Sequence, residues 1–356
     1  MSTMLADHTT LGLGGPAKAF RTAGSTDELV AFVAGADRSG ERVLVLGGGS
    51  NLVVADDGFP GTVILVASQS VTTAEAGTDP ETGEDVVLLR ADAGVEWDPL
   101  VERTVAEGLN GVEFLSGIPG RVGSTPIQNV GAYGQDVSQT VREVLVLDRT
   151  TGELVTMSNA DCGFTYRDSV FKGHDRYVVC EVVFELRRGG LSRPVRYAEV
   201  ARTMGVEAGD RVPLTQAREV VLGLRKGKGM VLDPADPDTR SAGSFFTNPV
   251  LSPEEYEAFR ERAAERLGSD AEIPGHPDDA GNVKLSAAWL IDRAGFTKGY
   301  GDGPARISGK HTLALTNPGG ASTADLLDLA REVRAGVEEA FGVRLVNEPV
   351  MLGVSL

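Results

Sequence analysis

Two glycine-rich stretches of the chain are candidates for binding a ligand that carries phosphate. The first, Gly47-Gly48-Gly49-Ser50-Asn51, joins two apolar runs. Successive small residues expose backbone N–H groups, which can form a concave anion site. A tight hairpin turn would explain the same residues. The stretch lacks the Gly-x-Gly-x-x-Gly spacing and no helix is predicted after it, so a Rossmann-type dinucleotide site is excluded.

The second stretch, residues 115–134, contains five glycines and two prolines. These residues set an irregular backbone path and allow close approach of a partner. Uncharged donors and acceptors lie between them, namely Ser116, Ser124, Thr125, Gln128 and Asn129. Such a loop suits a flat, polar-edged cofactor with a pyrophosphate. An ordered surface loop without a ligand is less favoured, because structureless segments of this length are usually functional.

The elements that must position these loops are a mixture of helices and strands. Apolar residues at helical spacing, together with caps, predict helices over 25–39, 95–108, 215–225, 286–294 and 322–341, and another that begins with the capping box at 252–255. Apolar runs predict strands on both sides of the first glycine stretch (43–56) and over 63–66, 86–91, 141–148 and 177–186.

Two features bear on how the chain is divided. The Pro- and Asp-rich segment 232–240 is the clearest candidate for a domain boundary. The last fifteen residues, 342–356, are predicted to form a strand that pairs back onto an earlier sheet.

Composition narrows the class of protein. The 356 residues carry 34 Lys plus Arg against 51 Asp plus Glu, a net charge of −17. This excess argues against nucleic acid or an anionic membrane as partner, but a few clustered cations can still bind an anionic small substrate. No window reaches the length of a membrane span, so a cytoplasmic protein is expected. Cys162 and Cys180 cannot hold a metal by themselves and are predicted to be reduced, buried thiols.

Six segments then occur in one order: GGGSN (47–51), SGIPGRVGSTPIQNVGAYG (116–134), YRDSVFK (166–172), AGSFFTNP (242–249), KLSAAWLID (284–292) and NEP (347–349). Together they closely resemble the MurB family, the UDP-N-acetylenolpyruvoylglucosamine reductases of bacterial peptidoglycan synthesis. The resemblance extends over nearly the whole chain, from Thr9 to Gly353.

The resemblance implies an α+β fold. It consists of a two-subdomain FAD-binding fold, like that of the p-cresol methylhydroxylase (PCMH) and vanillyl-alcohol oxidase flavoproteins, and an α+β substrate-binding C-terminal domain. We expect FAD-binding subdomain 1 over 1–70, joined by the C-terminal strand 343–356. Subdomain 2 is expected over 71–232 and the substrate-binding domain over 233–342.

The resemblance also implies the cofactors, which are non-covalent FAD and NADPH as reductant. The four histidines, His8, His174, His276 and His311, lie outside both glycine stretches, in agreement with a non-covalent flavin. The residues expected to bind FAD are Gly47, Gly48, Gly49, Ser50, Asn51, Leu52, Ser116, Gly117, Ile118, Pro119, Gly120, Gly123, Ser124, Gln128, Asn129, Gly131, Ala132 and Tyr133.

The implied reaction transfers a hydride from NADPH through the flavin to the enolpyruvyl methylene of UDP-N-acetylglucosamine enolpyruvate, and then protonates the adjacent carbon to give UDP-N-acetylmuramate. A guanidinium can stabilise the substrate carboxylate and a positioned acid can supply the proton. By resemblance the catalytic residues are Arg167, Ser244 and Glu348. Taken singly, each has a structural explanation: an ion pair with Asp168, a turn residue, and a solvated carboxylate at a strand end.

Four further residues are expected to bind the nucleotide sugar: Tyr166, Tyr197, Lys228 and Asn248. The tyrosine at 197 matches the residue that closes over substrate in one form of the family, and Lys228 is expected to meet the diphosphate. Lys226 is an alternative to Lys228. Arg225 belongs to the same cationic cluster, although a positive charge at a helix C-terminus would explain it equally well.

Two other functions remain open at this stage. One is a different flavin oxidase or dehydrogenase on the same cofactor scaffold. The other is a nucleotide-binding protein without chemistry. The expected partners are the small-molecule substrates alone, with no nucleic acid, membrane or metal, and the expected state is a monomer.

Overall fold

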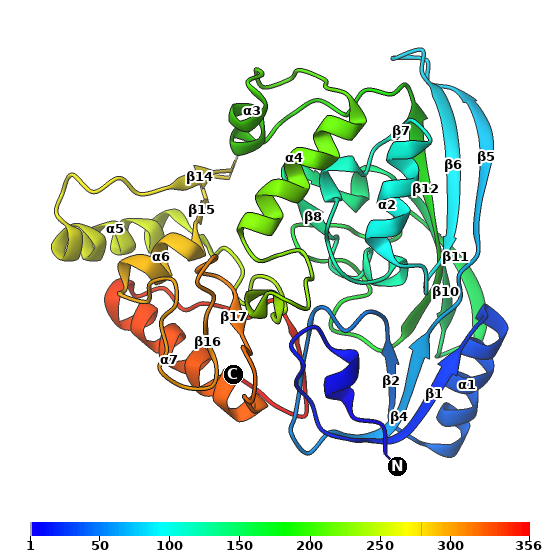
Figure 1. The fold of residues 1–356 in the computed structure, drawn as a ribbon, viewed down its shortest axis with the longest axis horizontal. Helices are drawn as coiled ribbons and strands as arrows, with labels where there is room; N and C mark the ends of the chain where they lie inside the picture. The colour runs from blue at the N-terminus through cyan, green and yellow to red at the C-terminus, as the bar shows by residue number, and fades with distance from the viewer. Residues whose placement is uncertain (1, 279) are drawn as a thin grey trace. The chain divides into compact units, whose positions relative to one another are not determined.

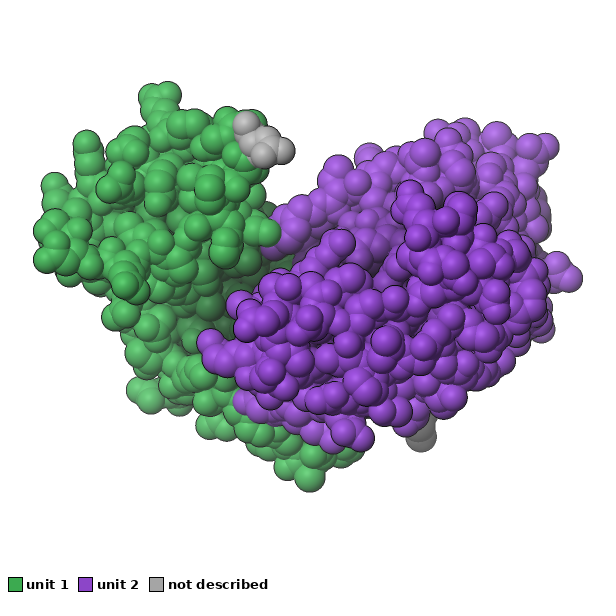
Figure 2. All heavy atoms as spheres, turned by 90° about the horizontal axis from the view of Figure 1, so that it is seen from above, with its two compact units in different colours: residues 1–16, 49–59, 232–356 green, residues 17–48, 60–231 purple. Residues whose placement is uncertain are grey.

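The structure is a computed structural model that describes residues 2–278 and 280–356. It divides into two compact units, each described here by itself (Figures 1 and 2). The change of unit at Leu232 coincides with the start of the Pro- and Asp-rich segment. The division into two flavin subdomains and a substrate domain stays a prediction. Unit 1 is Met1–Pro16, Gly49–Phe59 and Leu232–Leu356, and unit 2 is Ala17–Gly48 and Pro60–Val231.

The described part of unit 2 is built on two main sheets and a small two-stranded sheet, β8-β9. A three-stranded sheet has the order β1-β4-β2, and a larger sheet has the order β11-β10-β12-β6-β5, with β7 paired to β12. The strands are β1 (Ala17–Ala23), β2 (Val43–Leu46), β4 (Phe59–Val66), β5 (Val71–Thr78), β6 (Asp85–Asp92), β7 (Leu109–Asn110), β8 (Gly131–Ala132), β9 (Gln135–Asp136), β10 (Val141–Asp148), β11 (Glu153–Ser158) and β12 (Tyr177–Arg188).

The centre of the larger sheet is β12, which pairs antiparallel with both β10 and β6. Most of its apolar residues are buried, as expected of a central strand covered on both faces. Helix α2 (Trp97–Ala106) packs on this sheet through Trp97, whose ring centroid lies 5.6 Å from that of Phe184. Figure 1 shows α2 and α4 (Leu214–Gly227) on the same side of the sheet. The remaining helices of unit 2 are α1 (Thr26–Ser39) and α3 (Ala198–Met204).

Unit 1 has small sheets and three helices around a core of its own. Strand β3 (Leu52–Val54) pairs parallel with β18 (Val350–Leu352), so the predicted pairing of the C-terminal strand with an earlier element is confirmed. The other elements are β13 (Val250–Leu251), β14 (Gly275–Pro277), β15 (Val283–Leu285), β16 (Arg306–Ile307), β17 (Leu315–Thr316), α5 (Pro253–Leu267), α6 (Ala287–Arg293) and α7 (Thr323–Phe341).

Local signals explain where the main helices begin. The side chain of Ser25 accepts a hydrogen bond from the Glu28 N–H at the start of α1. Capping boxes are formed by Ser252 with Glu255 at α5 and by Ser322 with Asp325 at α7. Each satisfies N–H groups that have no partner inside the helix. The helix predicted over 95–108 is shorter in the structure, where α2 extends from Trp97 to Ala106.

The structure excludes one alternative for the first glycine stretch and corrects the predicted length of the C-terminal strand. The glycine stretch 47–51 is not a hairpin, because β2 pairs with β4 whereas β3 pairs with β18. The C-terminal strand is confined to Val350–Leu352, and the rest of 342–356 has no regular strand structure. Both cysteines are free and buried, as predicted. Among the described residues, no helix is both long and apolar enough to cross a membrane.

Candidate active site

The two glycine-rich stretches meet inside unit 2. A Cβ atom on Gly48 would lie 2.7 Å from the Cα atom of Gly120, and one on Gly47 would lie 2.5 Å from Oγ of Ser124. Real Cβ atoms do not approach other atoms this closely. At Gly48 the obstructing atoms are backbone, so a larger residue there would push the two loops apart, whereas at Gly47 the Ser124 side chain would have to rotate. Segments that are far apart in the sequence therefore form one cradle, which only glycine backbone can line at these positions.

The 115–134 loop is held by the first two residues of α2, Trp97 and Asp98. Trp97 donates its backbone N–H to Gly120 O at 3.0 Å and its indole N–H to Leu115 O at 3.1 Å. The carboxylate of Asp98 accepts the N–H of Gly117 at 2.6 Å and pairs with Arg218 at 2.6 Å. Burial opposes the charge of Asp98, but these hydrogen bonds outweigh it and the pKa of Asp98 is lowered. The loop is thus fixed by charged and backbone contacts rather than by apolar packing alone.

Three non-glycine residues of the described chain have φ angles in the left-handed region: Asn129 (47°), Tyr133 (52°) and Arg167 (56°). All three belong to the set predicted to form the site. Asn129 is held there by its amide, which donates to Thr165 O at 3.1 Å and accepts from the Ser138 N–H at 3.0 Å. Such strained conformations persist only where the surroundings enforce them, and they cluster at functional sites.

The predicted catalytic guanidinium lies beside the second glycine stretch. Nη1 of Arg167 is 3.4 Å from the position that a Cβ atom on Gly131 would take. The segment that carries Arg167 is tied to the same loop, because Ser169 Oγ donates to Ile127 O at 2.6 Å. The guanidinium carbon of Arg167 is 5.7 Å from the centroid of the Tyr166 ring, a side chain that is half exposed. In unit 2 the structure therefore brings together Arg167, Tyr166 and the second glycine stretch.

Three residues predicted to bind the cofactor or nucleotide sugar also meet in unit 2. The rings of Tyr133 and Tyr197 pack edge to face, with centroids 5.4 Å apart. Nζ of Lys228 lies 5.5 Å from the centroid of Tyr133. The same Nζ pairs with the carboxylate of Glu199 at 2.6 Å. Glu199 is a residue that sequence reasoning missed.

Arg225 is more deeply buried than a helix-end cation needs to be. Only 8% of the Arg225 residue is exposed to solvent, and its Nη2 donates to Met230 O at 2.8 Å. Within the described chain its Nε is buried without a hydrogen-bond partner, 3.3 Å from the position of a Cβ atom on Gly117. Burial lowers the pKa of Arg225. An unsatisfied buried donor is costly, so Nε of Arg225 is a candidate to donate to a bound polar group or a water molecule.

A second group of predicted residues meets inside unit 1. The Glu348 N–H donates to Phe245 O at 2.9 Å, next to Ser244 in the chain. Asn51 Nδ2 donates to Glu348 O at 3.4 Å, and Asn51 O accepts from the Val350 N–H at 2.9 Å. The turn that carries Ser244 is anchored by Phe245 and Phe246, both buried. The AGSFF, NEP and Asn51 motifs are therefore neighbours in the folded unit.

The other predicted residues divide between the two units. Asn248 uses its Oδ1 to accept the Ala287 N–H at 3.0 Å, at the start of α6. Ser116 is fully buried and donates its hydroxyl to Glu113 O at 2.6 Å. Their ligand contacts stay predictions. Gly49, Ser50, Asn51, Leu52, Ser244, Asn248 and Glu348 lie in unit 1, and the remaining predicted site residues, including Ile118, Pro119, Gly123, Gln128 and Ala132, lie in unit 2.

Comparison with known proteins agrees with this arrangement. Residues 17–158 match the family model described as FAD binding domain. Residues 234–352 match the model described as UDP-N-acetylenolpyruvoylglucosamine reductase, C-terminal domain. These two matches, with the mixed helices and strands, confirm the predicted fold class.

Relatives align over essentially the whole chain. A protein of Thermobifida fusca (strain YX) named UDP-N-acetylenolpyruvoylglucosamine reductase is 66% identical over 352 residues, which cover 99% of this chain and 97% of that protein. One of the same name from Streptomyces coelicolor is 60% identical over 354 residues, covering 99% and 90%.

A solved structure agrees with these relatives. The crystal structure of the reductase (MurB) from Thermus caldophilus is 26% identical, covers 99% of this chain and 98% of its own, and superposes with a TM-score of 0.65. On these matches, this chain belongs to the UDP-N-acetylenolpyruvoylglucosamine reductase family.

Proposed function

We propose that this chain is an NADPH-dependent flavoenzyme that reduces UDP-N-acetylglucosamine enolpyruvate to UDP-N-acetylmuramate in peptidoglycan biosynthesis. Its membership of the reductase family and its FAD-binding domain support this activity. The structural observation that carries the proposal is the position of Arg167 beside Gly131, because it puts a guanidinium at the loop expected to hold the flavin.

The residues present fit FAD. The two glycine stretches form a cradle that a side chain at Gly47 or Gly48 would fill, and Arg225 aims an unsatisfied donor at the same loop. The backbone N–H groups near Gly47 and Gly120 suit a pyrophosphate, and uncharged groups such as Gln128 and Asn129 suit a polar-edged ring. When bound, FAD supplies the hydride-transfer chemistry that no amino-acid side chain provides.

The chain's own residues hold the substrate and its protons. Arg167 binds the enolpyruvyl carboxylate through paired N–H donors and stabilises the negative charge that develops there when the methylene carbon gains a hydride. Ser244 holds a proton on Oγ for delivery to the adjacent carbon. Glu348, with its carboxyl protonated or bridged by a donor, hydrogen-bonds the carboxylate end of the substrate. These three roles follow from the family resemblance.

The nucleotide sugar is assigned to Tyr166, Tyr197, Lys228 and Asn248. The positions of two of these residues support the assignment. The Tyr197 ring and Nζ of Lys228 both lie beside the ring of Tyr133, where a phenol and an ammonium group can bind a diphosphate. Tyr197 is also 43% exposed, as a side chain that closes over substrate must be in the open protein. A monomeric state and a cytoplasmic location remain predictions.

The first experiment is an absorbance spectrum of the purified protein with and without NADPH. We expect a yellow protein that NADPH bleaches, and the enolpyruvyl sugar should restore the colour. Ser244→Ala should still be bleached by NADPH but should not turn over the sugar. Normal turnover by this variant would show that Ser244 is not the proton donor.

The same measurement separates the other functions. A yellow protein that consumes oxygen with an alcohol or hydroxy acid, and ignores the enolpyruvyl sugar, would be a different flavin enzyme. A colourless, folded protein that binds UDP-sugars would be a binding protein without redox chemistry.

A further inference from the structure

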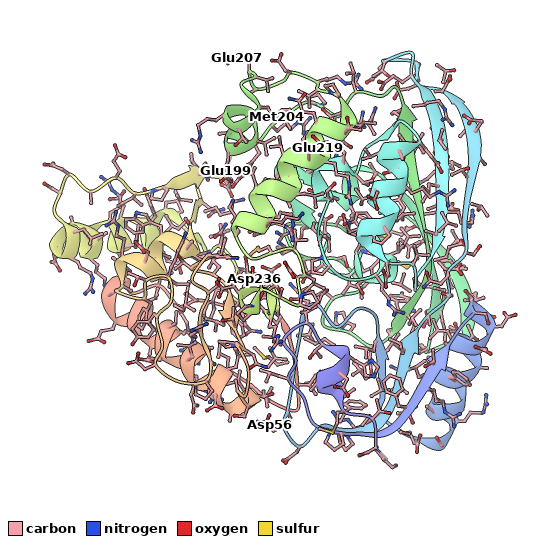
Figure 3. All side chains as sticks on the ribbon, in the orientation of Figure 1. Asp56, Glu199, Met204, Glu207, Glu219 and Asp236 are labelled. Carbon is pink, nitrogen blue, oxygen red and sulfur yellow. The ribbon has the colours of Figure 1, made fainter. Side chains whose placement is uncertain are left out.

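Lys228, the lysine expected to meet a diphosphate, is engaged by a carboxylate. Its Nζ lies 2.6 Å from Oε2 of Glu199, and both side chains are 29% exposed. Glu199 lies in the first turn of α3, two residues after Tyr197, the N-cap of that helix (Figure 3). One short segment therefore carries both the tyrosine expected to close over the nucleotide and the carboxylate that holds the lysine.

The charges at this point cancel. Burial opposes the charge of Lys228, but the hydrogen bond to Glu199 outweighs it, and the pKa of Lys228 is raised. The lysine is thus cationic, and its charge is balanced by a carboxylate at contact distance. Nζ of Lys228 also lies beside the ring of Tyr133, against which the ring of Tyr197 packs.

A diphosphate that approached Lys228 would also approach Glu199. Like charges a few ångströms apart repel, and they repel more strongly where the local dielectric constant is low. An ammonium has three donors on a flexible stem, so Lys228 can change partner by rotation. The carboxylate therefore opposes binding of the diphosphate and can re-form the ion pair when the ligand leaves.

We propose that Glu199 is an internal anion that competes with nucleotide diphosphates for Lys228 and so promotes their release. The proposal rests on the proposed function, which assigns Lys228 to the diphosphate. NADPH and the UDP-sugar both contain a diphosphate, so a carboxylate at Lys228 weakens whichever of them contacts that lysine. Glu199 is a positioning residue in this scheme, because it acts through Lys228.

The probe is uridine diphosphate, titrated into the oxidised holoenzyme by calorimetry at constant ionic strength. Glu199→Gln keeps the shape of the side chain and removes its charge. We expect this variant to bind UDP about fivefold more tightly, the factor that corresponds to an ion pair of about 1 kcal/mol. Glu199→Asp retains the charge and should lie closer to the wild type.

Three further measurements tie the effect to Lys228. Lys228→Gln should weaken UDP binding, and Glu199→Gln should have no effect when added to Lys228→Gln. In steady state, Glu199→Gln should lower KM for the UDP-sugar without raising kcat. The control is Glu219→Gln on α4, an exposed residue labelled in Figure 3, which loses the same charge and should leave UDP affinity unchanged within about twofold.

Equal or weaker UDP binding by Glu199→Gln would overturn the proposal, because Glu199 would then be neutral or would position Lys228 for the ligand. Unchanged UDP affinity in Lys228→Gln would also overturn the proposal about Glu199. If the wild type nevertheless turned over the enolpyruvyl sugar, the proposed reductase function would be unaffected. Conversely, a wild type without flavin or turnover would overturn the proposed function itself. The flavin spectrum of each variant verifies that it is folded.

Discussion

Gly48 and Gly120 approach so closely that a Cβ atom on Gly48 would lie 2.7 Å from the Cα atom of Gly120. The contact joins the loop after β2 to the 115–134 loop, which follows β7 in the chain. Because the obstructing atoms are backbone, they cannot move aside by rotating a side chain. The space between these loops is therefore set by the backbone itself.

Gly48→Ala should separate the two loops and weaken FAD binding. Overpacking of this kind costs about 1–3 kcal/mol, which corresponds to roughly a fivefold to 150-fold loss of affinity. Flavin fluorescence titration of the apoprotein measures it. Gly223→Ala on α4 is the control, since nothing lies within 4 Å of the added methyl group and alanine favours a helix by about 0.5–1 kcal/mol. Equal FAD affinity in the two variants would show that the contact between these two loops is not part of the flavin site.

Arg167→Lys should separate the two half-reactions. Lysine keeps a positive charge but lacks the paired donors of a guanidinium. We expect bleaching by NADPH to persist and reduction of the enolpyruvyl sugar to slow by about 10²–10³-fold, the usual cost of losing one donor to a developing oxyanion. Stopped-flow absorbance measures both steps.

A surface arginine provides the matched control for this variant. Arg142 on β10 forms an exposed ion pair with Glu185 on the neighbouring strand β12, and Arg142→Lys should leave both rates within about twofold. If Arg167→Lys behaved like Arg142→Lys, the catalytic role of Arg167 would be wrong.

The two thiols should be inert in the folded protein. Cys162 and Cys180 are at most 1% exposed, and burial raises the pKa of each to about 12. At pH 8 only about one thiol in 10⁴ is then ionised, and the thiolate is the reactive form. A chromogenic disulfide reagent should detect no rapidly reacting thiol in the native state and two thiols after unfolding in denaturant. Fast reaction of the native protein would contradict the buried positions.

Asp148 should make the stability of unit 2 depend on pH below neutrality. The hydrogen bond from Arg176, at 2.6 Å, holds the pKa of Asp148 at about 2 rather than 3.8. A lowered pKa contributes stability that is present above pH 3.8 and is lost as the pH falls toward 2. Wild type should therefore exceed Asp148→Asn in urea midpoint at pH 6, and the difference should shrink between pH 4 and pH 2.

Arg176→Gln tests the cause of this dependence. Without the guanidinium, the pKa of Asp148 should rise toward its ordinary value, so the loss of stability between pH 4 and pH 2 should be smaller than in the wild type. A difference between wild type and Asp148→Asn that stayed constant from pH 6 to pH 2 would show that the ion pair does not control stability.

Local signals predicted most of the helices and the buried strands. The caps at Ser25, Ser252 and Ser322 involve only residues within the first turn of each helix. The local sequence is therefore enough to predict where these helices begin. The apolar runs of β10 and β12 are strong because those strands lie inside the sheet. Strands β5 and β11 were missed because they are edge strands, mostly exposed, and carry no hydrophobic run.

Strand partners could not be predicted from local signals. The hairpin alternative at 47–51 could be excluded only by the structure, because a glycine turn between two strands does not specify whether those strands pair with each other. The pairing of β18 with β3 was expected only in outline, since an apolar tail indicates a strand but not its partner or its length.

By itself, the sequence determined the family, because six motifs in one order identify it whatever the geometry. It also determined which residue types are available at the glycine stretches and at Arg167, Ser244 and Glu348. Only the tertiary structure decided that Gly48 meets Gly120, that Arg225 is buried with an unsatisfied Nε, and that Glu199 holds Lys228. Burial and ion pairing depend on which distant segments come together, and that is a property of the folded chain rather than of any local pattern.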